Sequence, residues 1–144
     1  MKKNGINLIA LVCITFVLLI LSGTIIVSFN NVFNSTREKE FANEIYSIQK
    51  LVDQYYFKNR VYPVKGEEVS FIDSENNTIV GKEIDLYEAD VNESKRGKRR
   101  NSDSKDIYII SADGVVYYMK GEEIGDNIYY KLTNDLKKKI GLLK

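Results

Sequence analysis

Residues 37–60 read REKEFANEIYSIQKLVDQYYFKNR, and this stretch decides the fold. It contains no glycine or proline, and large apolar residues return in it every three or four positions, which is the spacing of one face of an α-helix. We therefore predict an amphipathic helix whose apolar stripe must pack on another layer. The stripe consists of Phe41, Ile45, Ile48, Val52 and Tyr55.

The other face of this helix is polar, so we expect only one side of the helix to pack on an apolar core. The helix should end within NRVYP, residues 59–63, because Asn59 tolerates a left-handed turn and Pro63 cannot continue the ladder of backbone hydrogen bonds. The polar face consists of Glu38, Lys39, Asn43, Glu44, Gln49, Lys50 and Asp53.

Towards the N-terminus, residues 6–29 form a run of 24 residues without a charged side chain. At about 1.5 Å of rise per residue this run reaches roughly 36 Å as a helix, enough to cross a hydrocarbon core of about 30 Å. An ordinary secretory signal is disfavoured, because its apolar region is only about 7 to 15 residues long and precedes a small-residue cleavage site. We predict a transmembrane helix that continues into residues 30–60, with Cys13 as one of its apolar residues.

The charges that flank this run predict its orientation. Lys2 and Lys3 precede it, whereas the four charges of residues 37–40 cancel, so the positive-inside tendency keeps the N-terminus cytoplasmic. Beyond Phe29 lie all 20 acidic residues and 19 of the 21 basic ones, a formal charge of 19 − 20 = −1. A general attraction for nucleic acid is therefore not implied, and a single cysteine excludes an internal disulfide framework.

After Pro63 the apolar pattern changes to a period of two, which predicts an antiparallel sheet. Asp113-Gly114 predicts a hairpin between two of its strands, with positive φ at both turn positions. Residues 81–91 stay ambiguous, and residues 120–127 are expected to be a long turn. The strands are expected at residues 69–72, 107–111, 115–119 and 128–132.

A short closing helix is expected at residues 133–142, with Thr133 or Asn134 as its N-cap and lysines near its C-terminus. The region after Pro63 is a small domain that buries little surface by itself. The amphipathic helix supplies the missing layer, so the predicted fold class is α+β, a long N-terminal helix packed on a small C-terminal antiparallel sheet.

The opening KKNG, followed at once by INLIALV, resembles the N-terminus of type IV pilins and pseudopilins. In that family a short basic leader ends in a glycine before an apolar helix. The resemblance implies that prepilin peptidase cleaves between Gly5 and Ile6, and that the new amine of Ile6 is methylated. IQKLVDQYYFKNRVYP, residues 48–63, is similar to the end of the pseudopilin helix.

The resemblance also implies a domain plan. It consists of a leader peptide at residues 1–5, an assembly helix at 6–29, an amphipathic half at 30–60 and an extracytoplasmic sheet domain at 61–144. In this family the fifth residue after the cut is usually a glutamate thought to meet the terminal amine of a neighbouring subunit, but here it is Ala10. Without that carboxylate, assembly is expected to depend on close packing of the 6–29 helices. Such contacts are individually weak, so we expect a minor subunit that joins filaments dominated by other subunits. The small or hydrogen-bonding positions of that helix are Asn7, Thr15, Ser22 and Gly23.

The sequence contains few of the residues that catalytic sites commonly use. There is no histidine, the only cysteine lies in the apolar run, and no glycine-rich phosphate loop precedes a helix, so we expect neither an enzyme nor a cofactor. The acidic segments 73–77 and 122–127 have no defined calcium-ligand spacing, and turn chemistry is the favoured interpretation. For Tyr108, Tyr117 and Tyr129 we favour packing in the sheet over a sugar-binding or adhesive surface.

The run KRGKRR, residues 95–100, concentrates five positive charges in six residues. It could contact DNA phosphates, but it contains no interleaved aromatic residue on which a base could stack. A solvated loop is therefore the favoured interpretation. The five charged residues are Lys95, Arg96, Lys98, Arg99 and Arg100.

Two functions from different classes follow from these features. The first is a structural subunit, a minor pilin or pseudopilin, of a type IV pilus, a secretion pseudopilus or a competence pilus at the cell surface. Its partners would be prepilin peptidase, the membrane and other pilin-like subunits. The second is a bitopic membrane-anchored protein that does not polymerise and whose outer domain binds a ligand or a partner.

Overall fold

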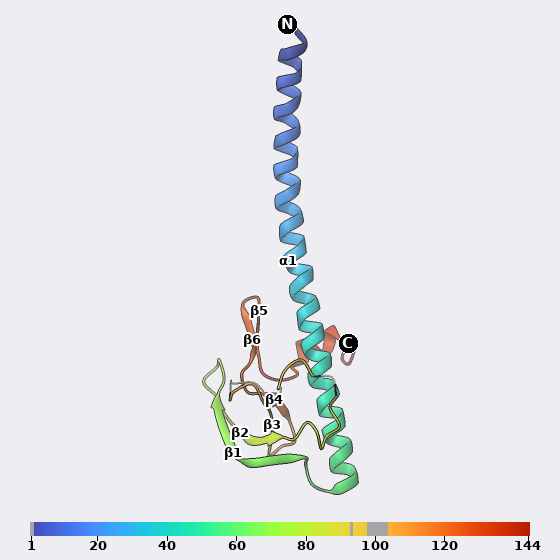
Figure 1. Cartoon of the computed structure of the whole chain (residues 1–144), viewed down its shortest axis with the longest axis vertical. Helices are drawn as coiled ribbons and strands as arrows, with labels where there is room; N and C mark the ends of the chain where they lie inside the picture. The colour runs from blue at the N-terminus through green and yellow to red at the C-terminus, as the bar shows by residue number, and fades with distance from the viewer. Residues whose placement is uncertain (1, 93, 98–103) are drawn as a thin grey trace. The chain divides into compact units, whose positions relative to one another are not determined.

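The computed structural model describes residues 2–92, 94–97 and 104–144, with side chains described outside residues 2–7 and 18–30. The chain divides into two compact units, Met1–Thr36 and Arg37–Lys144. Helix α1, Lys2–Asn59, runs through both (Figure 1). The fold is α+β, as predicted, with an N-terminal helix packed on a small antiparallel sheet.

The first unit is helical throughout its described backbone. The predicted anchor, residues 6–29, lies partly outside the residues whose side chains the structure describes, since only those of residues 8–17 are described within it. Within the described part of the chain, no helix has the length and apolar content that crossing a membrane requires.

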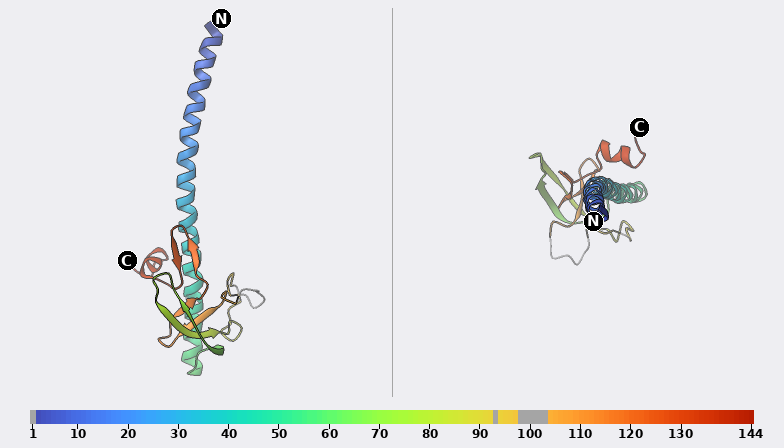
Figure 2. Two further views of the ribbon diagram at one scale, coloured as in Figure 1. Left: turned by 90° about the vertical axis from the view of Figure 1, so that its left-hand side faces the viewer. Right: turned by 90° about the horizontal axis from the view of Figure 1, so that it is seen from above.

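The second unit places residues 37–59 of α1 against one side of a four-stranded antiparallel sheet (Figures 1 and 2). The strand order is β1-β2-β3-β4, and the central pairings include Ile109 with both Glu83 and Tyr117. A separate hairpin and a short helix, α2, Asn134–Lys139, complete the unit. The strands are β1, Val64–Ile72, β2, Thr78–Ile84, β3, Tyr108–Ser111, β4, Val116–Tyr118, β5, Glu122–Ile124, and β6, Asn127–Tyr129.

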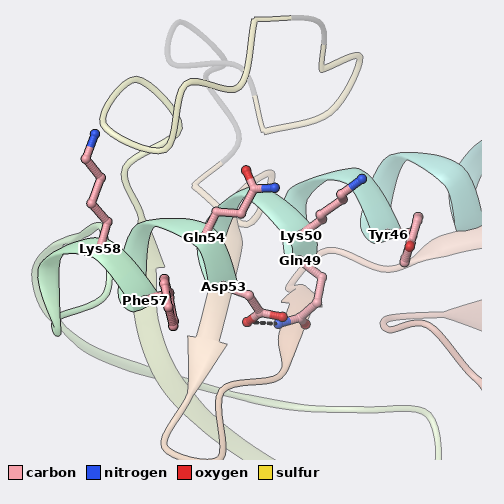
Figure 3. A pocket seen from close by; sticks show the side chains of 7 residues that line it. All are labelled: Tyr46, Gln49, Lys50, Asp53, Gln54, Phe57 and Lys58. Atoms are coloured by element: carbon pink, nitrogen blue, oxygen red, sulfur yellow. Dashed lines mark hydrogen bonds between the residues drawn. The ribbon is translucent and has the colours of Figure 1, made fainter.

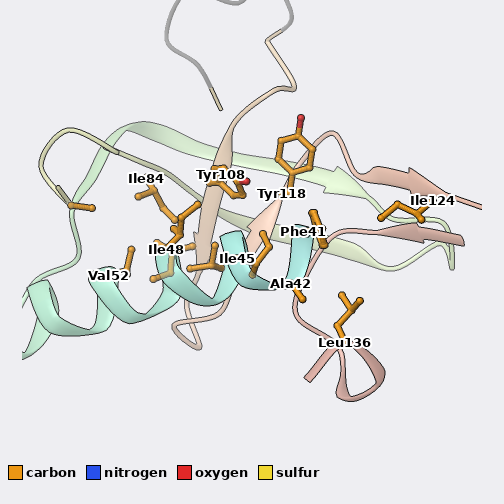
Figure 4. Close-up of a cluster of buried hydrophobic side chains, with 13 residues drawn as sticks. Phe41, Ala42, Ile45, Ile48, Val52, Ile84, Tyr108, Tyr118, Ile124 and Leu136 are labelled. Carbon is orange, nitrogen blue, oxygen red and sulfur yellow. The ribbon is translucent and has the colours of Figure 1, made fainter. Parts of the chain in front are cut away.

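The predicted apolar stripe forms the centre of the core (Figure 4). Four of its residues are at most 1% exposed, and Tyr55, the fifth, is half-buried. The stripe packs against side chains of β2, β3 and β4, and Leu136 of α2 belongs to the same buried cluster (Figure 4). The buried members of this cluster are Phe41, Ala42, Ile45, Ile48, Val52, Ile84, Ala89, Tyr108, Ile110, Val116, Tyr118, Ile124 and Leu136.

The end of α1 corrects one detail of the prediction. The helix ends at Asn59, but the left-handed residue is Arg60, with φ of 62°. The backbone amide of Arg60 still donates to the carbonyl of Tyr56 at 2.7 Å, so the turn comes one residue later than expected. Asn59 instead donates from its side chain to the carbonyl of Tyr55 at 3.1 Å.

The hairpin at Asp113-Gly114 is confirmed, but its turn type is not the expected one. Of the two residues only Gly114 has a positive φ, at 81°. The amide of Ser111 donates to the carbonyl of Val115 at 3.0 Å, so the loop has three residues, 112–114. In such a loop only the last residue needs the left-handed conformation, which is why glycine stands there.

Three segments of the sheet differ from the sequence prediction. The ambiguous residues 81–91 contain the end of β2 followed by a turn, and β1 begins at Val64, five residues before the predicted strand. The predicted long turn at 120–127 contains β5, and the predicted strand at 128–132 is only the short β6. These segments carry charged or glycine residues, so their pairing depends on tertiary contacts more than on β propensity.

Helix α2 confirms one of the two N-caps left open. Thr133 is the cap, because its hydroxyl accepts a hydrogen bond from the amide of Leu136 at 3.2 Å. The helix is shorter than predicted because Gly141 takes φ of 82°, and the amide of Leu142 turns back to the carbonyl of Lys137 at 2.8 Å. That arrangement is a glycine-terminated helix end.

Candidate functional site

Helix α1 carries the predicted cleavage and assembly residues, and the structure describes two of them in full. Ala10 and Thr15 are exposed, and the hydroxyl of Thr15 donates to the carbonyl of Leu11 at 2.8 Å. This bond satisfies the hydroxyl inside its own helix. Gly5, Ile6, Asn7, Ser22 and Gly23 have helical backbone, and their side chains lie outside the described set.

The described part of this run exposes large apolar side chains on every side of the helix. At 100° per residue, positions 8, 11, 14 and 17 follow one half of the helix surface, and positions 9, 12 and 16 lie on the other half. Each of the large apolar residues is between 53% and 67% exposed. These described residues therefore lack the polar face that a water-exposed helix of a globular domain has. These residues are Leu8, Ile9, Leu11, Val12, Ile14, Phe16 and Val17.

The second unit contains an ion-pair network centred on Arg96. The guanidinium of Arg96 contacts Glu44 of α1 at 2.5 Å and Glu122 of β5 at 2.9 Å. Only 14% of the Arg96 side chain and 12% of the Glu44 side chain are exposed. The guanidinium also lies 5.2 Å from the ring centroid of Phe41. Arg37 adds a second cation to Glu122 at 3.3 Å. One loop arginine therefore ties the helix to the β5–β6 hairpin.

Tyrosine hydroxyls extend this network into the core. The hydroxyl of Tyr108 donates to Glu44 at 2.8 Å, and the hydroxyl of Tyr118 donates to Asp106 at 2.5 Å. Asp106 also accepts from the amide of Gly97 at 2.9 Å. Gly97 leaves no room for a side chain, because a Cβ there would lie 2.8 Å from the Tyr108 ring. Each buried polar group of this network has a partner, as burial requires.

These contacts shift the pKa values of the charged pair. Burial acts to lower the pKa of Arg96, but the hydrogen bond with Glu122 and the charges of Glu44 and Glu122 outweigh it and raise the pKa. Burial acts to raise the pKa of Glu122, but the contacts with Arg96 and Arg37 hold it below its usual value. Both side chains are therefore held in their charged forms.

The polar face of α1 has more protein partners than the sequence suggested. Gln49 donates to the carbonyl of Gly114 at 2.8 Å and accepts from the amide of Val116 at 2.9 Å, so it holds the β3–β4 hairpin. Glu38 accepts from the hydroxyl of Tyr129 at 3.1 Å and pairs with Lys139 of α2. Only the apolar side of the helix forms the core, but Glu38, Glu44 and Gln49 on the polar side bind other elements through polar contacts.

The basic run at residues 95–100 is likewise not uniformly solvated. Arg96 is the buried centre of the network, whereas Lys95 is 78% exposed and reaches Glu40 only at 4.0 Å. Lys98, Arg99 and Arg100 lie outside the described residues. The solvated-loop interpretation is therefore wrong for Arg96. The sequence contains one weak signal for this contact. Glu44 lies at the edge of the apolar stripe, and a carboxylate buried there needs a cation as its partner.

The three tyrosines expected in the sheet do pack there. Tyr108 is buried, Tyr117 and Tyr129 are half-buried, and the Tyr129 ring lies 6.2 Å from that of Phe41. Asp73, in one of the two acidic segments, accepts hydrogen bonds from the amides of Glu75 and Asn77, both at 2.9 Å. The bond from the Asn77 amide is the main cause that lowers the pKa of Asp73. Among the described residues there is no cluster of acidic or cysteine side chains that could hold a metal ion.

The buried tyrosines predict a loss of stability at alkaline pH. Burial, followed by the charge of Glu44 for Tyr108 and the hydrogen bond to Asp106 for Tyr118, raises both pKa values above the ordinary 10.0. Below pH 10 both phenols are protonated in the folded and unfolded states, so their contribution is complete there. Above it the unfolded chain loses protons that the folded chain keeps, so the free energy of unfolding should fall as the pH rises. Urea unfolding at about pH 9, 10 and 11 measures this.

The variant Tyr108→Phe tests the origin of that loss. It removes one of the two phenols, so the decline between about pH 10 and 11 should become shallower. The matched variant Tyr87→Phe, at an exposed tyrosine, should leave the decline unchanged. Equal slopes in all three proteins would contradict the assignment to buried phenols.

No family model, curated protein or solved structure matches this chain.

Proposed function

We propose that the chain is a structural subunit of a filament of the type IV pilus class, most readily a minor pilin or pseudopilin. Residues 6–29 would be both its membrane anchor and its assembly surface. The observation that carries this proposal is the ring of exposed apolar side chains over residues 8–17. Exposing such an apolar surface to water is unfavourable. Lipid would cover it before assembly, and the equivalent helices of other subunits would cover it in the filament.

The leader supports the same function. Lys2 and Lys3 precede Gly5, and the helix continues without a charge from Ile6 to residue 29. Cleavage between Gly5 and Ile6 by prepilin peptidase would remove the leader and leave the anchor intact. Exposed Ala10 offers no carboxylate to the amine of a neighbour, so contacts between helices would be individually weak and the subunit would join filaments that other subunits dominate.

Processing gives the direct test. Expressed with an active prepilin peptidase, the chain should have an intact mass that begins at Ile6 with a methylated amine, and Gly5→Arg should retain the leader. The matched variant Asn4→Arg adds the same charge one residue earlier and should still be cleaved. A wild-type chain that keeps residues 1–5 beside an active peptidase would contradict the pilin assignment and favour a membrane-anchored protein that does not polymerise.

A further inference from the structure

Aromatic and basic side chains gather where α1 ends. The segment YYFKNRVYPVK, residues 55–65, contains four aromatic rings and three positive charges. Phe57 is 76% and Tyr56 is 41% exposed, although large rings are usually covered in a folded domain. This surface takes no part in the Arg96 network or in the proposed anchor.

Two grooves flank these rings. The first, of about 560 Å³, lies between the end of α1 and strands β1 to β3, and its lining includes Tyr56, Arg60, Tyr62 and Lys82. The second, of about 630 Å³, follows the surface of α1 and includes Lys50, Phe57 and Lys58 (Figure 3). Both volumes fall within the range of about 300 to 1,000 Å³ that ligand sites occupy.

The rings in these grooves contact one another and a cation. Tyr56 stacks on Tyr62 with ring centroids 4.4 Å apart and planes inclined by 22°. The guanidinium of Arg60 lies 5.6 Å from the ring centroid of Phe57. A flat ligand would therefore meet aromatic surface and a planar cation close together.

The charges around the grooves select the kind of ligand. Among the lining side chains, Lys50, Lys58, Arg60 and Lys82 are positive, and only Asp53 and Glu68 are negative. Asp53 also accepts a hydrogen bond from Gln49 at 3.0 Å (Figure 3). The surface therefore favours an anion, and its aromatic rings favour one with flat apolar faces.

We propose that this aromatic-basic surface, formed by Lys50, Tyr56, Phe57, Lys58, Arg60 and Lys82, binds single-stranded nucleic acid. Its cations contact phosphates, and bases stack on its exposed rings. A duplex keeps its base faces within its own stack, so it can use only the charges. The run at residues 95–100 lacks this combination, because it has no aromatic residue.

The test uses the full chain in detergent and a fluorescent oligothymidine, with binding followed by anisotropy at several salt concentrations. The wild-type chain should bind saturably, and it should bind the single strand more tightly than a duplex of equal length. Tyr56→Ala should weaken binding about tenfold through the lost stacking. The double variant Arg60→Gln/Lys82→Gln should weaken it and reduce the logarithmic salt slope by about 0.7 for each lost phosphate contact.

Matched variants provide the controls. Lys137→Gln/Lys138→Gln removes the same charge from α2, and Tyr87→Ala removes an exposed ring elsewhere, so both should bind as the wild type does. Arg60 and Lys82 are exposed, so their variants should fold even if Tyr56→Ala does not. Absent binding, equal affinity for the duplex, or equal losses in the controls would overturn the proposal. Because the assay needs neither filament nor leader cleavage, its failure leaves the pilin proposal standing.

Discussion

Replacing Arg96 with glutamine should lower the free energy of unfolding of the second unit by about 3 kcal/mol, the loss expected when one partner of a buried ion pair is removed. The reason is that Glu44 and Glu122 would be left as partly buried carboxylates that have lost a shared cation. Phe41 would also lose the guanidinium that lies over its ring. Urea unfolding of the wild-type and variant chains in the same detergent measures the difference.

The neighbouring residue provides the control. Lys95→Gln removes the same charge from the same run, but Lys95 is 78% exposed, so its effect should stay within about 0.5 kcal/mol. In the Arg96→Gln background, Glu122→Gln should restore part of the lost stability because it removes one of the two carboxylates. Equal effects of Arg96→Gln and Lys95→Gln would mean that Arg96 is solvated after all.

The free energy of unfolding at acid pH should also depend on the Arg96 network. The pKa of Glu122 is held below its ordinary 4.5, so its contribution to stability is present above pH 4.5 and is lost as the pH falls through the lowered value. Without Arg96 the pKa of Glu122 should move back towards the ordinary value. Between about pH 5 and pH 3 the Arg96→Gln variant should therefore lose less stability than the wild type.

Replacing Phe41 with alanine should lower the free energy of unfolding by about 3 to 5 kcal/mol, the range for deleting a buried phenylalanine ring. Phe41 has no exposed surface and lies 6.4 Å from the ring of Tyr118 and 6.2 Å from that of Tyr129. Its removal would leave a cavity between α1, β4 and the β5–β6 hairpin. The same urea titration measures the loss.

Phe57→Ala is the matched control for Phe41→Ala. It makes the same chemical change on the same helix, but Phe57 is 76% exposed, so we expect an effect within about 0.5 kcal/mol. Similar losses at the two positions would mean that the stripe does not form the core that Figure 4 shows.

Features that rest on local chemistry could be predicted from the sequence. The stripe from Phe41 to Val52 follows from helical periodicity, because only one face of that helix is apolar. The hairpin at Gly114 and the cap at Thr133 follow from conformations that glycine and threonine favour over a few residues. The end of α1 was predicted to within one residue for the same reason.

The tertiary structure decided which charged and polar residues became structural. Nothing local distinguishes Arg96 from the exposed Lys95 beside it, and Arg96 is buried because Glu44 and Glu122, from two distant elements, meet at its position. Strand β5 was missed for the same reason, since its half-buried Glu122 is stabilised there by cations from distant parts of the chain. Ion pairs and buried hydrogen bonds join residues far apart in the chain, so a periodicity or a turn preference carries no information about them, whereas the apolar faces and caps were set by the sequence itself.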